Sequence, residues 1–236
     1  CRKRDYSKGH RSEVKSSPVL STPLHSTRLY ETDCEFSCNL LTRFTTAYVY
    51  MFFVSKKLLI YYKEVSYMAW IVAESRPLNS EEMRNNAQEQ ANYMINFGFT
   101  ANAISAILGN EQSESTINPG RWQSDIVGNM SGGFGLVQWT PATNIINWLT
   151  ARGLPRTDGN GQCLWLATES GNGQWIPTGA YPLSWDEFKN SKQSPEYLAR
   201  AFLYNFERPK DPAATAAARA RQALNWFNTL DWSGAG

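Results

Sequence analysis

The sequence contains little cysteine and little histidine, and most of both lies near its beginning. The cysteines and histidines that precede residue 68 are Cys1, His10, His25, Cys34 and Cys38. Because Cys163 is the only cysteine after that point, the later part of the chain has no internal disulfide and needs a core of its own. Cys34 and Cys38 have no matching pair downstream, and a structural zinc site uses four ligands, so no metal site is expected.

An excess of charge of one sign is also absent, since 23 basic residues stand against 21 acidic ones for a net charge of +2. Residues 1–67 hold eleven basic and six acidic residues, whereas residues 68–236 hold twelve and fifteen. A body of net charge −3 with dispersed charges offers no basic stripe to a phosphate backbone. Nucleic acid is therefore not expected as a partner.

Apolar runs are short, and none approaches the ~20 residues of a membrane-spanning helix. The most apolar stretch, residues 47–62 (AYVYMFFVSKKLLIYY), is split by Lys56 and Lys57. It lies too far from the N-terminus for a signal peptide, and no small-x-small cleavage site follows it. A membrane anchor is disfavoured and an ordered extra element stays open, while the favoured interpretation of residues 1–67 is non-native or loosely ordered sequence.

A folded domain is predicted to begin near Met68 and to consist mainly of helices. Asn79, with Glu82 three residues later, is a capping-box pattern, and Gly98 marks the end of the helix that follows. Thr100 is suited to cap the next helix. The other predicted helix starts are Thr140-Pro141, Ser184 with Glu187, Ser194-Pro195 and Asp211-Pro212, the last helix running toward Leu230. The domain covers residues 68–232, and residues 233–236 read as the start of a Gly/Ser-type linker or tail.

Glycine gathers between Trp122 and Gln138, where the helical pattern is interrupted. Four glycines, at positions 128, 132, 133 and 135, alternate there with apolar residues. Such punctuation predicts a short β-hairpin or an irregular loop packed beside the helices. The expected fold class is therefore α+β and mostly helical.

Two acids end the second predicted helix, in the run ILGNEQSESTINPGRW of residues 107–122. On a helical wheel that starts at Ile104, Glu111 falls within the apolar stripe, whereas Glu114 lies at its edge, about 80° away. A carboxyl group at an apolar edge beside a Gly-rich loop suits a general acid, because burial disfavours the charged form and retains the proton. The pattern alone also fits a Glu114 that only caps or solvates the helix end.

Several motifs in this order resemble the phage tail lysozyme family, in particular its muramidase domains at the tail tip of phi29-like phages. The resemblance runs from about Met68 to Trp232 and takes in NNAQ, ESTINPG, GFGLVQWTP and ERP. It implies a lysozyme-like fold whose Gly-rich loop lies beside a sugar cleft. It also implies that Glu114 is the catalytic acid and that the Gly-Leu-x-Gln element, Gly135, Leu136 and Gln138, lines the cleft.

A second catalytic carboxylate is harder to identify. Glycosidases usually pair two acids, and Asp125, eleven positions after Glu114, is the nearby acid on a loop that can fold back over the cleft. Asp125 is therefore the candidate, with a solvated loop aspartate as the alternative. Gln138 is expected to bind substrate or to brace the loop, and Trp122 and Trp139 to stack on sugar rings or to fill the core.

Two further acids are expected to have structural roles. Glu111 stands where relatives carry an apolar residue, and a buried acid needs a partner, so we expect structural pairing, with tuning of the Glu114 pKa as the alternative. Glu207, next to Arg208, is expected to form a buried or half-buried ion pair with it. Relatives of the tail-tip type can continue into a zinc peptidase domain, and this chain, with both histidines near its N-terminus, is not expected to carry that activity.

The resemblance implies an enzyme that hydrolyses the β-1,4 bond between N-acetylmuramic acid and N-acetylglucosamine in peptidoglycan, without a cofactor. It would act on the bacterial cell wall from a phage tail tip, encoded by a phage or a prophage. The expected partners are glycan strands and other phage tail proteins. Two alternatives are a lytic transglycosylase that uses the same glutamate and a catalytically silent structural or sugar-binding tail subunit. Glu114 beside an intact Gly-Leu-x-Gln element argues against the silent subunit.

Overall fold

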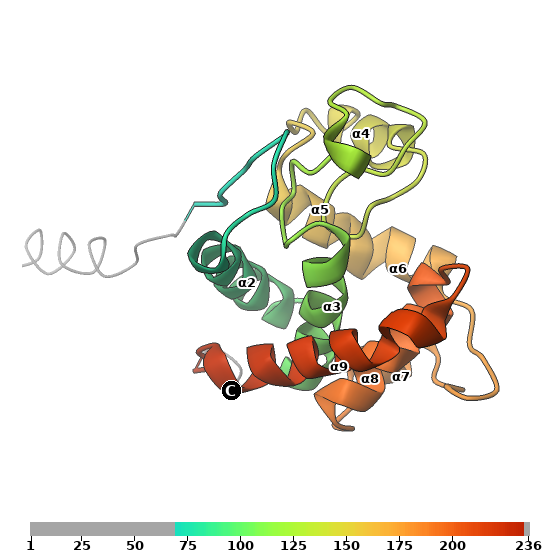
Figure 1. The fold of residues 1–236 in the computed structure, drawn as a ribbon. Helices are drawn as coiled ribbons and strands as arrows, with labels where there is room; N and C mark the ends of the chain where they lie inside the picture. Colours follow the sequence, from blue (N-terminus) through green and yellow to red (C-terminus); the bar gives the residue numbers. More distant parts are fainter. Residues whose placement is uncertain (1–68, 234–236) are drawn as a thin grey trace, which may run out of the picture. The chain divides into compact units, whose positions relative to one another are not determined.

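The computed structural model describes residues 69–233, and the predictions made for residues 1–67 and for the Met68 boundary lie outside them. The described residues fold mainly into helices joined by loops, which confirms the mostly helical prediction and is compatible with a lysozyme-like fold (Figure 1). The α-helices are α2 (Ser80–Ile95), α3 (Ala101–Glu114), α4 (Thr143–Thr150), α5 (Gly159–Trp165), α6 (Gly171–Gln174), α7 (Trp185–Lys189), α8 (Pro195–Phe202) and α9 (Pro212–Thr229). The short 3₁₀ helix η1 (Gln123–Asp125) and the π-helical turns η2 (Leu166–Ser170) and η3 (Leu203–Glu207) complete the set.

Side-chain caps begin most of the predicted helices where the sequence placed them. The Asn79 side chain accepts from the backbone of Glu82, whose carboxylate accepts from the backbone of Asn79, and Ser184 and Glu187 repeat this capping box. Thr100, Ser194 and Asp211 cap α3, α8 and α9. These caps satisfy backbone N–H groups that have no partner inside the helix.

The helix predicted to open at Thr140-Pro141 is present as α4, but it begins slightly later than predicted. Helix α4 begins at Thr143, after Ala142, and the Thr140–Pro141 peptide bond is cis. The N–H of Ala142 donates to the carbonyl of Gly132 at 2.8 Å, so the chain is still tied to the Gly-rich loop at that point. The first helical residue is therefore Thr143, the residue that follows this hydrogen bond in the sequence.

The Gly-rich segment is an irregular loop and does not form a regular β-hairpin. Within residues 69–233 its strand-like pairing is limited to isolated antiparallel bridges, Trp122 with Phe134 and Phe134 with Trp139. Gly135 and Gln138 have positive φ angles of 81° and 52°, which no regular strand contains. These turns explain why the predicted alternation of apolar residues and glycines does not extend into strands.

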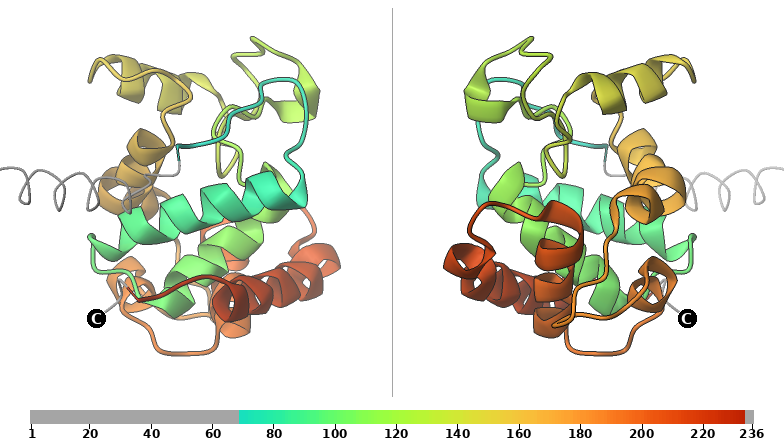
Figure 2. Two further views of the ribbon diagram at one scale, coloured as in Figure 1. Left: turned by 90° about the vertical axis from the view of Figure 1, so that its left-hand side faces the viewer. Right: turned by 90° about the vertical axis from the view of Figure 1, so that its right-hand side faces the viewer.

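Helix α3 lies at the centre of the fold. Its residues 103–111 are all buried, and it packs against α2, α8 and α9. Figure 1 shows α3 through the middle of the molecule with α9 running across it, and the turned views of Figure 2 show the same helices packed together. None of the helices in residues 69–233 is long and apolar enough to span a membrane.

Gly109 sets the close approach of α3 and α9. A Cβ atom at Gly109 would lie 2.6 Å from the carbonyl oxygen of Arg219 and 2.7 Å from the backbone nitrogen of Ala223. Only glycine allows two helix backbones to come this near to each other. The contact brings Arg219 alongside the last turns of α3, where Glu114 lies.

The chain turns sharply after Glu114. Thr116 and Ile117 have left-handed φ angles of 59° and 54°, a conformation uncommon for residues other than glycine. The buried hydroxyl of Ser115 donates to the carbonyl of Leu136 at 2.7 Å, and the buried Asn118 accepts from the N–H of Gly120 at 2.9 Å. The first bond holds the Gly-rich loop against the C-terminal end of α3, and the second closes the turn itself.

Candidate active site

A pocket of about 320 Å³ opens beside the C-terminal end of α3. Glu114 contributes one wall, and Glu207, the last residue of η3, contributes another together with Pro209. The Gly-rich loop supplies most of the remaining lining, including Arg121 and Gln138. The pocket therefore brings together two carboxyl groups that are 93 residues apart in the sequence.

Glu114 is held by an arginine from α9. Its Oε1 accepts a hydrogen bond from Nη2 of Arg219 at 2.5 Å. The Glu114 side chain is 23% exposed and that of Arg219 is 6% exposed. Arg219 also donates from Nη1 to Oδ1 of the buried Asn110 at 3.1 Å. The guanidinium is thus fixed from two sides, while Glu114 still reaches the pocket.

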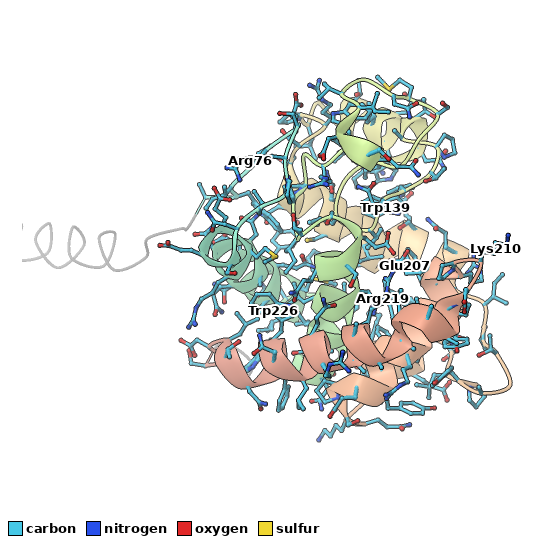
Figure 3. All side chains as sticks on the ribbon, viewed as in Figure 1. Arg76, Trp139, Glu207, Lys210, Arg219 and Trp226 are labelled. Atoms are coloured by element: carbon cyan, nitrogen blue, oxygen red, sulfur yellow. The ribbon has the colours of Figure 1, made fainter. Side chains whose placement is uncertain are left out.

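Glu207 presents a second carboxyl group to the pocket. Its Oε1 is buried and accepts no hydrogen bond from any of the residues that the structure describes. Burial raises the pKa of Glu207 well above its usual range, the charge of Glu114 raises it further, and the charge of Arg219 opposes both. Figure 3 shows Glu207 and Arg219 next to each other beside α3.

The predicted ion pair between Glu207 and Arg208 is wrong. Arg208 donates instead from Nη1 to the backbone carbonyls of Gln174 and Asn205. Arg208 itself adopts a left-handed conformation with φ of 48° at the end of η3, which directs its side chain to these carbonyls. Glu207 is consequently left facing the pocket.

Glu111 is buried beneath the pocket and does not line it. Its Oε1 accepts from Nε2 of Gln90 at 3.0 Å, whereas its Oε2 has no partner within residues 69–233. Burial raises the pKa of Glu111 to about 8, and the hydrogen bond from Gln90 only partly opposes this. The structural partner expected for Glu111 is therefore an amide, and Glu111 carries a proton at neutral pH.

Asp125 forms an ion pair with Arg121 in the Gly-rich loop. Their closest atoms are Nε of Arg121 and Oδ1 of Asp125, at 3.0 Å, and the Asp125 side chain is 36% exposed. Ser124 and Asp125 both have left-handed φ angles, of 55° and 57°. In the described part of the chain, Arg121 and Ser124 line the pocket and Asp125 does not. Asp125 thus contacts the site through Arg121.

The Gly-Leu-x-Gln element braces the loop. A Cβ atom on Gly135 would lie 2.5 Å from Oε1 of Gln162, and the same oxygen accepts from the N–H of Leu136 at 2.9 Å. Gln138 donates from Nε2 to the carbonyls of Arg121 and Gly135, at 3.1 and 3.0 Å, and its side chain also lines the pocket. Gln138 is the member of this element that combines bracing with access to a ligand.

Both tryptophans proposed as sugar platforms are buried. Trp122 is 1% exposed and lies 4.5 Å from Phe134, measured between ring centroids. Trp139 is 3% exposed, packs against Trp165 and donates from Nε1 to the hydroxyl of Ser170. Trp122 forms part of the pocket wall, and in this arrangement neither indole offers a free face for a sugar ring.

The pocket residues lie in a part of the chain that matches a known protein family. The family model for phage tail lysozyme matches residues 85–230. The chain belongs to the phage tail lysozyme family. It is also 45% identical over 158 residues to morphogenesis protein 1 of Bacillus phage B103, a match that covers 66% of this chain and 42% of that relative. The chain therefore spans less than half of the relative's length, and both findings support a tail-associated, lysozyme-like role.

Two residues that support the pocket could not be predicted from the sequence. Arg219 lies in an Ala-rich helix 105 residues after Glu114, and no local pattern marks it as the partner of that glutamate. Gln162 carries no signal either, although its buried amide joins α5 to Pro119 and Leu136 by bonds of 2.7 and 2.9 Å.

Within residues 69–233, no three His, Cys, Asp or Glu side chains are grouped so that they can hold a metal ion. The polar groups that line the pocket are carboxyl, guanidinium, amide and hydroxyl groups.

Proposed function

We propose that this protein is a glycoside hydrolase that cleaves the β-1,4 bond between N-acetylmuramic acid and N-acetylglucosamine in peptidoglycan, with Glu114 as general acid. The observation that carries the proposal is the position of Glu114, the last residue of α3, on the wall of a pocket of about 320 Å³. A carboxyl group that is partly shielded and still reachable by a ligand suits protonation of a glycosidic oxygen. Membership of the family supports the same reaction.

In the proposed reaction, Glu114 gives its proton to the leaving oxygen as positive charge develops on the cleaved sugar. Water then supplies a hydroxyl group to the sugar and returns a proton to the site. Gln138 and Arg121 line the same pocket and can hydrogen-bond the acetamido sugars. No cofactor is part of this proposal.

Asp125 stays a candidate for the group that directs the water. Its ion pair with Arg121 lies at the edge of the pocket, so it can act there directly or by orienting the guanidinium. Asp125→Asn is expected to reduce wall lysis, and an unchanged rate would assign the direction of water to another group.

We also propose that the protein acts on the bacterial cell wall from the tail tip of a virion, with glycan strands as substrate and other phage tail proteins as neighbours. The support is the family match and the relative named as a morphogenesis protein. Clearing of suspended Gram-positive cell walls tests the enzymatic part of this proposal. The wild-type chain should clear them, whereas failure to do so would favour the silent structural or sugar-binding subunit.

A lytic transglycosylase is the second candidate. It is favoured by one observation, that Asp125 does not line the pocket among the described residues, because a transglycosylase needs no second carboxylate to direct water. Its product carries a 1,6-anhydro end formed by attack of the sugar's own 6-hydroxyl group. The two reactions are therefore separated by the ends that they leave on the glycan.

A further inference from the structure

Three carboxyl groups, those of Glu111, Glu114 and Glu207, lie near the guanidinium of Arg219 beside the pocket. Arg219 bonds to Glu114, and Glu207 interacts electrostatically with Glu114, Arg219 and Glu111. Arg208 has the weakest of these influences on Glu207, and its guanidinium is bonded to backbone carbonyls, so Arg219 is the cation that pairs with a carboxylate here. A single positive charge balances one carboxylate, and further negative charges in a buried setting are costly. The group is therefore closest to neutral when two of the three carboxyls are protonated.

Glu111 accounts for one of these two protons. It is fully buried, bonds to the neutral amide of Gln90, and its pKa is raised to about 8. The remaining proton belongs to the pair formed by Glu114 and Glu207, the two carboxyls that line the pocket.

Two polar atoms beside the pocket, one on Arg219 and one on Glu207, have no hydrogen-bond partner within residues 69–233. Nε of Arg219 is buried and donates to none of the residues described here, and Oε1 of Glu207 is buried and likewise accepts from none. A buried donor and a buried acceptor without partners are rare in folded proteins, and such groups call for an explanation. Their presence in one charged group indicates that the guanidinium has a second carboxyl available to it.

We propose that Glu207 is the second carboxyl of the active site and shares one proton with Glu114, while Arg219 pairs with whichever of the two is charged. In the arrangement described here, Arg219 pairs with Glu114 and the proton resides on Glu207. When Arg219 turns to Glu207, the O–H bond of Glu207 breaks and an O–H bond forms on Glu114, so the net charge of the pair is unchanged. Water in the shared pocket can carry the proton between them.

The exchange gives Glu114 the proton that it donates in the reaction, and this consequence rests on the proposed function. Glu114 is 23% exposed in the open pocket, so water stabilises its charged form there. A glycan strand that fills the pocket displaces that water and makes the charge on Glu114 more costly. Substrate binding thus favours the arrangement in which Glu114 holds the proton. Glu207 is a positioning residue in this scheme, because it acts through Glu114.

The other charged and titratable groups near the pair have partners of their own. Arg208, after η3, bonds to backbone carbonyls, and Arg121, in the Gly-rich loop, pairs with Asp125. Cys163 of α5 is buried near Glu111, and its pKa is raised by burial, so it stays a neutral thiol. Arg219 is therefore the guanidinium available for exchange between Glu114 and Glu207.

Carboxyl titration by NMR tests the shared proton without any substrate. The full chain, labelled with ¹³C at glutamate carboxyls, is titrated as wild type, Glu114→Gln, Glu207→Gln and the exposed control Glu81→Gln. In Glu114→Gln, the titration midpoint of Glu207 should fall by about one pH unit or more, because a like charge is removed and Arg219 is free to pair with Glu207. In Glu207→Gln, the Glu114 signal should show a single step, because no second carboxyl remains to share the proton. In wild type the two signals should each show both steps. Independent, single-step titrations in wild type would overturn the proposal, even if a variant fails to fold.

The pH dependence of wall lysis supplies the second test. In Glu207→Gln, the basic limb of the profile should move to lower pH by about one unit, and Glu207→Asp should restore part of the shift. Glu81→Gln should leave the profile in place. An unshifted limb in a folded Glu207→Gln variant would overturn the inference. If wild type does not lyse walls at all, the proposed function fails, while the NMR titration still decides whether the proton is shared.

Discussion

Nη2 of Arg219 and Oε1 of Glu114 lie 2.5 Å apart, although 105 residues separate them in the sequence. The pair exists because α3 and α9 approach at Gly109 and because Asn110 holds the other side of the guanidinium. In the proposed reaction, Glu114 must obtain its proton despite the positive charge of the buried Arg219 beside it. Glu207 lines the same pocket and is the group proposed to supply it.

Removal of Arg219 should destabilise the fold. Arg219→Met leaves Glu114 without its counter-ion, and breaking a largely buried ion pair typically costs about 3 kcal/mol of unfolding free energy. Adding Glu114→Gln to that variant should recover part of the loss, because the unpaired charge disappears. Urea denaturation at pH 7 measures both values. Equal stability of the single and double variants would show that the unpaired charge of Glu114 costs little.

Gly109→Ala should also destabilise the protein, by about 1–3 kcal/mol, because the new methyl group meets the backbone of α9. Gly173→Ala is the matched control, since no described atom outside its own turn of helix lies within 4 Å of a Cβ atom there. Thermal unfolding should separate the two variants, with Gly173→Ala at or above the wild-type midpoint. A Gly109→Ala variant as stable as wild type would mean that α3 and α9 can move apart freely.

Glu111 should make stability depend on pH. Its pKa is about 8 in the folded chain and near 4.5 in the unfolded one, so the folded state prefers the neutral form. Stability that is present below about pH 4.5 is therefore lost as the pH rises through 8. Glu111→Gln does not titrate, so its stability relative to wild type should rise over this window by a few kcal/mol and then level off. Urea denaturation at several pH values measures the difference, and a constant difference would contradict the assignment.

Local sequence signals predict most helix starts well, but they do not predict contacts between residues that are far apart in the sequence. A cap such as Asn79 acts on residues within one turn, so the sequence contains all of its partners. The Arg219–Glu114 pair and the Gln162 bonds depend on where distant helices meet, and no short window holds that information. The sequence predicts an ion pair between Glu207 and its neighbour Arg208. The left-handed backbone of Arg208 at the end of η3 instead directs that side chain to backbone carbonyls.

In the Gly-rich loop, too, some features can be predicted from the sequence and others cannot. Its position beside the helices followed from composition, whereas the left-handed residues that prevent a hairpin, such as Gln138, could not be read from the sequence. Aromatic residues are equally ambiguous, because a tryptophan suits a sugar platform and a core alike. Burial of Trp122 and Trp139 is a property of the packed structure.

A shortened chain tests the predicted domain boundary. Residues 68–236 keep Ile71, whose backbone bonds twice to Asn86 at 2.8 Å, and Ala73, which bonds to Asn118. This chain should unfold as cooperatively as the full one. A chain of residues 76–236 loses these bonds and should be less stable by at least about 2 kcal/mol. Calorimetry measures both, and loss of cooperativity in residues 68–236 would show that residues 1–67 complete the core.

The most direct test of the central claim is mass spectrometry of peptidoglycan digested by wild type and by Glu114→Gln. Wild type should release muropeptides that end in N-acetylmuramic acid with an ordinary reducing end, which borohydride reduces. Glu114→Gln, folded as wild type, should release them ~10²–10⁴-fold more slowly, because it lacks the acid proton. Predominance of 1,6-anhydro ends would contradict hydrolysis, and release by Glu114→Gln within about tenfold of wild type would contradict Glu114 as the general acid.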